Sequence, residues 1–147
     1  MNYSQDAIDL IKQSEGFSAC VYRCLAGRYT IGYGHVVSSK NVSRNITEIE
    51  ATSLLNRDLV IFSHYINQRV RVTLTQGQYD ALCSLVYNWG CLNFGRSKGL
   101  RFLNQGQYSL AAIEFFSKEK GVVRVRSKFI PGLYKRRTAE LKLWSRR

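Results

Sequence analysis

The residues best suited to proton transfer or nucleophilic attack lie in one short stretch near the N-terminus. Glu15 is followed after eight residues by Cys24, and Cys24 is followed after five residues by Thr30. A carboxyl group can donate a proton, a thiolate can act as a nucleophile, and a hydroxyl can orient a water molecule. On these residues alone, Glu15 fits an ordinary helix end as well as it fits a catalytic acid.

The pattern around these residues predicts the elements that position them. Ser4 is a good N-cap for a helix over about 4–14, after which Glu15 and a glycine end the helix. Glycine-punctuated β-branched and aromatic residues predict a small antiparallel sheet over 17–37. Thr47 then opens a longer helix through a capping box.

The second half of the chain is mostly helical in pattern. Turn residues separate the expected helices, and a proline suits the first turn of the last one. We expect helices at Thr75–Trp89, Ser97–Leu103, Tyr108–Ser117 and Pro131–Trp144. The basic, alternating segment 122–130 fits neither pattern, so its structure is left open.

These elements predict an α+β fold in which two lobes flank a crevice. A small lobe with a short antiparallel sheet takes about 15–60, and a long helix connects it to a larger, all-helical lobe. The larger lobe takes about 70–147 together with the helix over 4–14. We expect the whole chain, 1–147, to be one domain, because its length supports one core. Crevices between lobes are common ligand sites.

The charge of the chain is strongly positive and unevenly distributed. The net charge is +12, of which +2 lies in residues 1–75 and +10 in residues 76–147. Such a field favours a polyanionic partner such as nucleic acid, an anionic membrane face or an acidic cell-wall polymer. No apolar run approaches the roughly 18–20 residues that cross a bilayer, so we expect no stable membrane insertion and no secretory signal.

The cysteines and histidines do not form a metal-binding pattern. The chain has four cysteines, no C-x-x-C pair and only two histidines, so we expect no metal site and no cofactor. Without a signal peptide, the thiols are expected to stay reduced. Cys83 and Cys91 lie in or beside an apolar segment and are expected to behave as small apolar residues.

The spacing of Glu15, Cys24 and Thr30 resembles the catalytic signature of phage-type lysozymes, glycoside hydrolase family 24. The second position of that signature is usually Asp, with Cys in some phage endolysins. The run 30–35 matches the family's strand. Further along, 78–90 is similar to its central helix, and 131–140 is similar to its C-terminal signature.

The resemblance implies a lysozyme-like fold and a peptidoglycan muramidase. Such an enzyme hydrolyses the β-1,4 bond between N-acetylmuramic acid and N-acetylglucosamine, and as an endolysin it lyses the bacterial host at the end of a phage cycle. It implies a monomer that accumulates in the host cytoplasm and reaches the periplasm and cell wall after a holin permeabilises the membrane. Bacterial peptidoglycan is then the polyanionic partner, and nucleic acid is not.

The resemblance also implies roles for single residues. Glu15 would be the acid that protonates the leaving oxygen, and Thr30 would orient a water molecule. Cys24 would either attack the sugar as a thiolate or help to place the water. Arg136 or Arg137, in the C-terminal motif, would orient the carboxyl group, although a nearby arginine also opposes the protonated form.

The resemblance places substrate contacts at Val36, after the catalytic strand, and at Tyr87 and Ser97 across the cleft. Some relatives hold a catalytic cysteine in a disulfide, which makes oxidation of Cys20 with Cys24 a regulatory alternative. In an extended chain these two residues would lie roughly 13 Å apart, beyond the ~7 Å over which a disulfide forms, so a tight bend would be needed.

Three other functions compete with a muramidase. A catalytically dead cell-wall-binding protein of the same fold would keep the cleft, and Cys24 is the feature that favours it. A lytic transglycosylase would need Glu15 but neither Thr30 nor Cys24. A nucleic-acid-binding protein is suggested by charge alone, because the chain lacks a helix-turn-helix signature or an aromatic RNA-binding strand.

Overall fold

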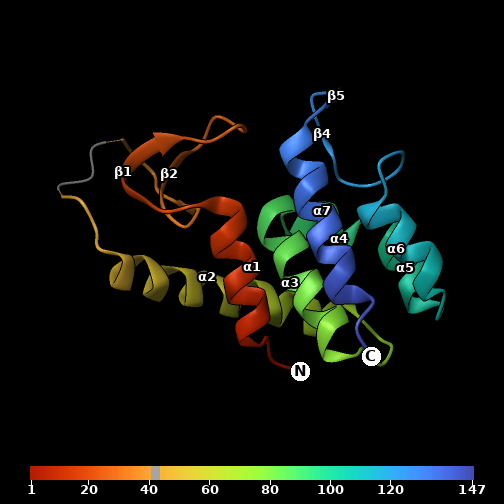
Figure 1. Cartoon of the computed structure of the whole chain (residues 1–147). Coiled ribbons are helices and arrows are strands. Elements are labelled where there is room, and N and C mark those ends of the chain that lie inside the picture. Colours follow the sequence, from red (N-terminus) through yellow and green to blue (C-terminus); the bar gives the residue numbers. More distant parts are fainter. Residues whose placement is uncertain (41–43) are drawn as a thin grey trace.

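A small sheet stands beside a cluster of helices, and one long helix runs along the base of both (Figure 1). The computed structural model describes residues 1–40 and 44–147. In chain order, the described elements are α1 (Gln5–Glu15), β1 (Ser18–Arg23), β2 (Tyr29–Gly32), β3 (His35–Val36), α2 (Glu48–Arg69), α3 (Gln76–Trp89), α4 (Cys91–Gly95), α5 (Lys98–Asn104), α6 (Tyr108–Phe116), β4 (Arg124–Val125), β5 (Lys128–Phe129) and α7 (Pro131–Trp144).

The first helix ends at Glu15 and so places this residue beside the sheet. Ser4 caps α1 by accepting a hydrogen bond from the backbone of Asp6, and Gly16, with φ of 68°, turns the chain out of the helix. The sheet has the order β1-β2-β3, and all of its pairs are antiparallel. Tyr22 on β1 pairs directly with Thr30 on β2, so these side chains lie on the same face of the sheet.

The long helix α2 connects the two lobes. Its capping box is formed by Thr47 and Glu50, as the sequence predicts. Its 22 residues span about 33 Å at 1.5 Å per residue. One end packs under β2 and β3, and the other packs against α3 and α4. His35 on β3 and Asp58 on α2 add a polar link, with Nδ1 and Oδ2 2.7 Å apart.

The core of the larger lobe is built around α3. This helix is buried from Tyr79 to Val86 and packs against α1, α2, α4 and α7. The same core includes aromatic rings from α4, α6 and α7, with centroids 5.6–6.4 Å apart. These rings belong to Phe94, Phe115, Phe116 and Trp144.

The predicted α+β architecture is confirmed, with two differences in the larger lobe. Residues 122–130, which the sequence left open, include the hairpin β4–β5, so this lobe is not all-helical. The short helix α4 was not predicted. The helices predicted at 4–14, 97–103 and 108–117 are present with ends shifted by one residue. None of the described helices is long and apolar enough to cross a membrane.

Candidate active site

The carboxyl group of Glu15 is held between the sheet and the last helix. Arg136 on α7 donates a hydrogen bond from Nη1 to Glu15 Oε1 at 2.6 Å, and the two side chains are only 6% and 20% exposed. On the other side lies Gly34, in the turn between β2 and β3 with φ of 88°. A Cβ atom on Gly34 would stand 3.0 Å from both Cδ and Oε2 of Glu15. This position therefore needs glycine for its backbone and for its lack of a side chain.

Arg136 is held in place by contacts with residues other than Glu15. Its Nε and Nη2 donate to the hydroxyl and the carbonyl oxygen of Ser84 on α3, at 3.3 and 3.2 Å. Its Nε also lies 3.4 Å from Glu140 Oε1, one turn further along α7. Sequence reasoning missed Ser84 and Glu140. Ser84 could have been noticed as a polar residue within the apolar run of α3, and Glu140 as an acid within the buried part of α7.

The two candidate arginines have different surroundings. Arg136 contacts Glu15, whereas the adjacent Arg137 is fully buried and donates from Nη2 to Glu140 Oε1 at 2.9 Å. Its Nε lies 2.7 Å from Glu140 Oε2, at an angle outside the range of a hydrogen bond. Of the two arginines that the sequence left as alternatives, the structure places Arg136 against Glu15. Neighbouring helical residues point about 100° apart, so only Arg136 faces Glu15.

Cys24 lies in the tight turn between β1 and β2. Its backbone N–H donates to the carbonyl of Arg28 at 3.0 Å, and its carbonyl accepts from Gly27 at 2.8 Å. Burial alone would raise the pKa of the Cys24 thiol. Hydrogen bonds from the turn backbone and from the Thr30 hydroxyl outweigh burial, so the pKa of Cys24 lies below its ordinary value. A lowered pKa favours the reactive thiolate form.

The other cysteines differ from Cys24. Burial raises the pKa of Cys83, with the Asp80 carboxylate acting in the same direction, and burial alone raises the pKa of Cys91. Cys20 is exposed on β1, and all four thiols are free. Oxidation of Cys20 with Cys24 stays a prediction.

Thr30 and Tyr22 complete the surface that faces Glu15. Thr30 is buried, and its hydroxyl lies 3.0 Å from the Arg28 carbonyl, so its single proton is directed either to that carbonyl or to Cys24. Burial raises the pKa of Tyr22, and the nearby negative charges of Glu15 and Cys24 raise it further. Tyr22 therefore lies close to both groups, and sequence reasoning gave it no role. Its place two residues before Cys24, on a strand beside Thr30, was the available signal.

The predicted substrate-binding residues lie at three different places. Val36 is about half exposed, on β3 at the edge of the sheet. Tyr87 on α3 donates its hydroxyl to the Tyr33 carbonyl at 2.7 Å, so it joins the lobes. Burial raises the pKa of Tyr87, and the negative charges of Asp58 and Glu15 act in the same direction. Its ring thus lies beside the site, while its hydroxyl is already engaged.

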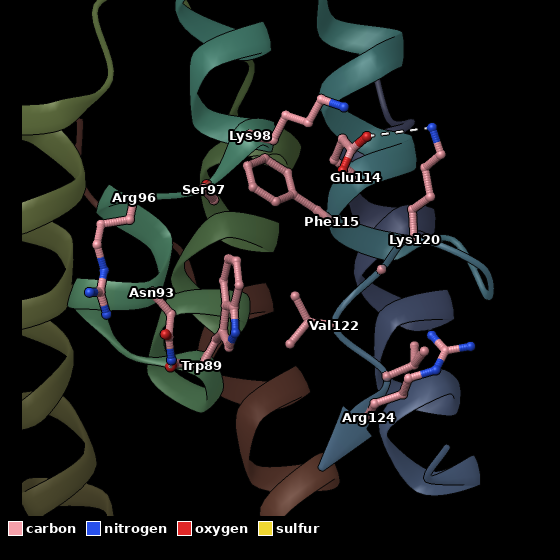
Figure 2. A pocket seen from close by; sticks show the side chains of 13 residues that line it. Trp89, Asn93, Arg96, Ser97, Lys98, Glu114, Phe115, Lys120, Val122 and Arg124 are labelled. Atoms are coloured by element: carbon pink, nitrogen blue, oxygen red, sulfur yellow. Dashed lines mark hydrogen bonds and ion pairs between the residues drawn. The ribbon is translucent and has the colours of Figure 1, made fainter. Parts of the chain in front are cut away.

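Ser97 lies in a pocket of the larger lobe (Figure 2). It caps α5 by accepting from the Leu100 backbone at 3.1 Å and donates to the Phe94 carbonyl at 2.7 Å. The pocket holds about 410 Å³, and Tyr87 is not part of its lining. Figure 2 shows aromatic and aliphatic side chains around the opening and charged groups at the rim. The charged lining residues are Arg96, Lys98, Glu114, Lys120 and Arg124.

The pocket carries an excess of positive charge. Four of its lining residues are basic and one is acidic, and that acid, Glu114, lies 3.7 Å from Lys120. Anions with several carboxylates suit such a lining. Among residues 1–40 and 44–147, no group of three or more His, Cys, Asp or Glu could hold a metal ion.

Comparison with known proteins gives consistent matches. The family model described as phage lysozyme matches residues 12–140. An endolysin of Acyrthosiphon pisum secondary endosymbiont phage 1 is 42% identical over 144 residues, which cover 98% of each chain. An endolysin of Bacillus phage PZA is 38% identical over 149 residues, and the chain spans about half (55%) of that relative's length. Among solved structures, the muramidase domain of SpmX from Asticaccaulis excentricus is 32% identical, with a TM-score of 0.84 over 99% of each chain.

Proposed function

The chain belongs to the phage lysozyme family and is a glycoside hydrolase, and we propose that it is a muramidase that lyses a bacterial host. The substrate proposed is peptidoglycan, and the bond is the β-1,4 link between N-acetylmuramic acid and N-acetylglucosamine. The observation that carries the proposal is the carboxyl group of Glu15, which Arg136 fixes near Tyr22, the strand partner of Thr30 and a neighbour of Cys24.

Glu15 is proposed as the general acid. Arg136 binds Oε1, which directs the proton to Oε2, and Gly34 has no side chain that would cover this oxygen. The proton moves from Oε2 to the glycosidic oxygen as the bond from that oxygen to the anomeric carbon breaks. A water molecule later adds its hydroxyl to the anomeric carbon, and Glu15 regains a proton.

Cys24 is proposed to act on the anomeric carbon from the sheet side. Its lowered thiol pKa supports a thiolate there, and the Thr30 hydroxyl bonded to it supports a shared role in placing a nucleophile. Two routes fit these contacts. In the first, the sulfur forms a covalent bond to the anomeric carbon, and water later replaces it and gives its proton to Glu15. In the second, the thiolate accepts the proton of the water that attacks directly, and exchange with solvent then deprotonates the thiol and reprotonates Glu15.

The pocket around Ser97 is proposed to hold a further part of the substrate. Peptidoglycan stem peptides carry carboxylates, which match the four basic side chains at the rim. Val36 at the sheet edge and the ring of Tyr87 are proposed to line the sugar path between this pocket and Glu15.

We further propose that the chain works as a single domain over 1–147 and as a monomer, because residues from both of its ends form one site. As an endolysin, it is proposed to leave the host cytoplasm through a membrane permeabilised by a holin and to act in the periplasm on the cell wall. This part rests on the endolysin relatives.

Replacement of the proposed acid tests this function. Glu15→Gln should lower lysis of outer-membrane-permeabilised bacteria by at least about 100-fold, because an amide has no proton to give. Asp9→Asn, on the exposed side of the same helix, is the matched control and should lyse at the wild-type rate. The decrease in turbidity is measured, together with the masses of the released sugars.

Each competing function has its own result in this experiment. Lysis by Glu15→Gln within a few-fold of the wild type would remove Glu15 from the mechanism. Wall binding by the wild type without any released fragments would identify a dead binding protein. Products with anhydro ends would identify a lytic transglycosylase.

A further inference from the structure

Four alternating charges form a continuous buried row behind the proposed acid. Glu15 contacts Arg136 at 2.6 Å, Arg136 lies 3.4 Å from Glu140, and Glu140 is bound by Arg137 at 2.7–2.9 Å. Side-chain exposure falls along the row from 20% at Glu15 to 6% at Arg136 and 0% at the other two. Ser84 joins the row through α3, since its hydroxyl donates to Glu140 Oε1 at 2.7 Å.

The row has a consequence for the proton that Glu15 must carry. A guanidinium against a carboxyl group favours the ionised carboxylate, which cannot act as an acid. Glu140 opposes this effect because its negative charge lies on the far side of the same guanidinium. Since these groups are buried, water screens their interactions little. With Glu15 protonated, the row carries a net charge of +1 in the presence of Glu140 and would carry +2 in its absence.

We propose that Glu140 is a positioning residue that aims Arg136 at Glu15 and offsets enough of its positive charge for Glu15 to keep its proton. Arg137 acts in the opposite direction, because its positive charge neutralises part of the negative charge of Glu140 and leaves less to offset Arg136. The balance between Glu140 and Arg137 therefore sets the pH range over which Glu15 is a competent acid. This inference rests on the proposed role of Glu15.

The other titratable groups that face Glu15 are the same in every variant considered. They are Tyr22 on β1, Cys24 in the turn after it, and Tyr87 on α3. The pKa values of both tyrosines are raised, so they stay neutral in the working range. Cys24 is unchanged in all of these variants, so any effect it has on Glu15 is the same throughout.

Three variants test the inference. Glu140→Gln removes the negative charge that offsets Arg136. Arg137→Gln removes the positive charge that neutralises part of Glu140. The double variant removes both charges. The readout is the titration of the Glu15 carboxyl carbon by ¹³C NMR in glutamate-labelled protein. The chain has six glutamates, and the Glu15 signal is identified by its loss in Glu15→Gln.

Opposite shifts are expected from the two single variants. The midpoint of the Glu15 titration should fall by about one pH unit in Glu140→Gln and rise by a similar amount in Arg137→Gln. In the double variant it should return to within a few tenths of a unit of the wild-type value. A purely structural role would lower the melting temperature of all three variants without this reversal of sign.

Shifts in the same direction, or no shift in either single variant, would overturn the inference. If Glu140→Gln does not fold, Arg137→Gln decides alone, because only an upward shift supports the inference. The NMR titration does not depend on lysis, so the charge balance is tested even if Glu15→Gln proves active and the proposed function fails.

Discussion

At the scale of the single residue, Cys24 is the group whose chemistry differs most from that of the usual signature. The carboxylate usual at this position is ionised at neutral pH, whereas a thiol needs help to ionise. The turn supplies that help through hydrogen bonds from its backbone and from Thr30. The sequence predicted the residue and its neighbours but not these bonds, because they depend on how the turn closes.

Substitution of Cys24 separates the sulfur from the shape of the turn. Cys24→Ser should lose most lytic activity, because a neutral hydroxyl is neither anionic nor a good nucleophile at neutral pH. Cys24→Asp should keep activity, because its carboxylate is ionised without the hydrogen bonds of the turn. Both variants are compared with the wild type by the decrease in turbidity of permeabilised bacteria. Full activity in Cys24→Ser would make the position a bystander.

Thiol alkylation provides the control for this pair. At pH 7–8 iodoacetamide should modify Cys24 ahead of Cys83 and Cys91, because the pKa is lowered at Cys24 and raised at the other two. Trypsin cuts after Arg23 and Arg28, so mass analysis separates the Cys24 peptide from the exposed Cys20. Alkylation should inhibit the wild type and spare Cys24→Asp. Equal inhibition of both would place the sensitive thiol elsewhere.

At the scale of the element, the turn between β2 and β3 works as one wall of the site. Gly34 lies against the Glu15 carboxyl group, and the next residue, His35, ties the turn to Asp58 on α2. The long helix thereby helps to fix the position of this turn. A change in this turn should therefore reduce catalysis by more than a change of similar backbone strain elsewhere.

Gly34→Ala is the variant that tests this wall. The added Cβ would meet Glu15 at 3.0 Å, so we expect a loss of lysis of about 10-fold or more. Gly106→Ala is the matched control, since its φ of 75° imposes the same type of strain with no atom within 4 Å. Each variant should lose about 1–2 kcal/mol of unfolding free energy, measured by urea denaturation. Similar lysis by both would show that the close contact has no role.

The accuracy of the sequence prediction differs from one element to another. Helices opened by Thr47 and Thr75 were predicted because their caps are local signals, and both form capping boxes. The hairpin β4–β5 could not be predicted, because Arg126 and Ser127 adopt φ of 50° and 67° where glycine or asparagine is usual. The structure of that turn is set by its tertiary surroundings.

The same limit applies to the site. The sequence indicated Glu15, Cys24 and Thr30 by their spacing, and the fold brings Tyr22 close to them. The sequence alone could not show which of Arg136 and Arg137 contacts Glu15, because adjacent residues share every local signal. Which of the two faces Glu15 depends on how α7 is rotated against α3, and that rotation is a property of the assembled core.

At the scale of the whole molecule, the excess of positive charge divides into two uses. Residues 118–147 contain eleven Lys and Arg and two acids. Nine of the eleven are exposed, while Arg136 and Arg137 are buried in the charge row. The exposed nine suit a polyanionic wall, and the buried two belong to the site.

Binding to purified cell walls should therefore fall steeply with salt. Exposed charges are screened over about 8 Å at physiological ionic strength, so sedimentation with walls should weaken between about 0.05 and 0.5 M NaCl. Lys128→Gln/Lys135→Gln should weaken binding at low salt, whereas Lys40→Gln/Arg57→Gln, the same change in exposed residues of the first half, should do so less. Salt-independent sedimentation, or equal effects of the two pairs, would contradict a role for this surface.

The contact between Glu15 and Arg136 joins residues 121 positions apart, and it has a consequence for the order of synthesis. A ribosome makes Glu15 early and Arg136 late, and contacts of such long sequence separation form only after both partners have emerged. A nascent chain that ends before α7 has an unoriented acid and no charge row behind it. On the proposed role of Glu15, translation products that end before α7 should therefore lack hydrolytic activity, because their acid has no partner to orient it.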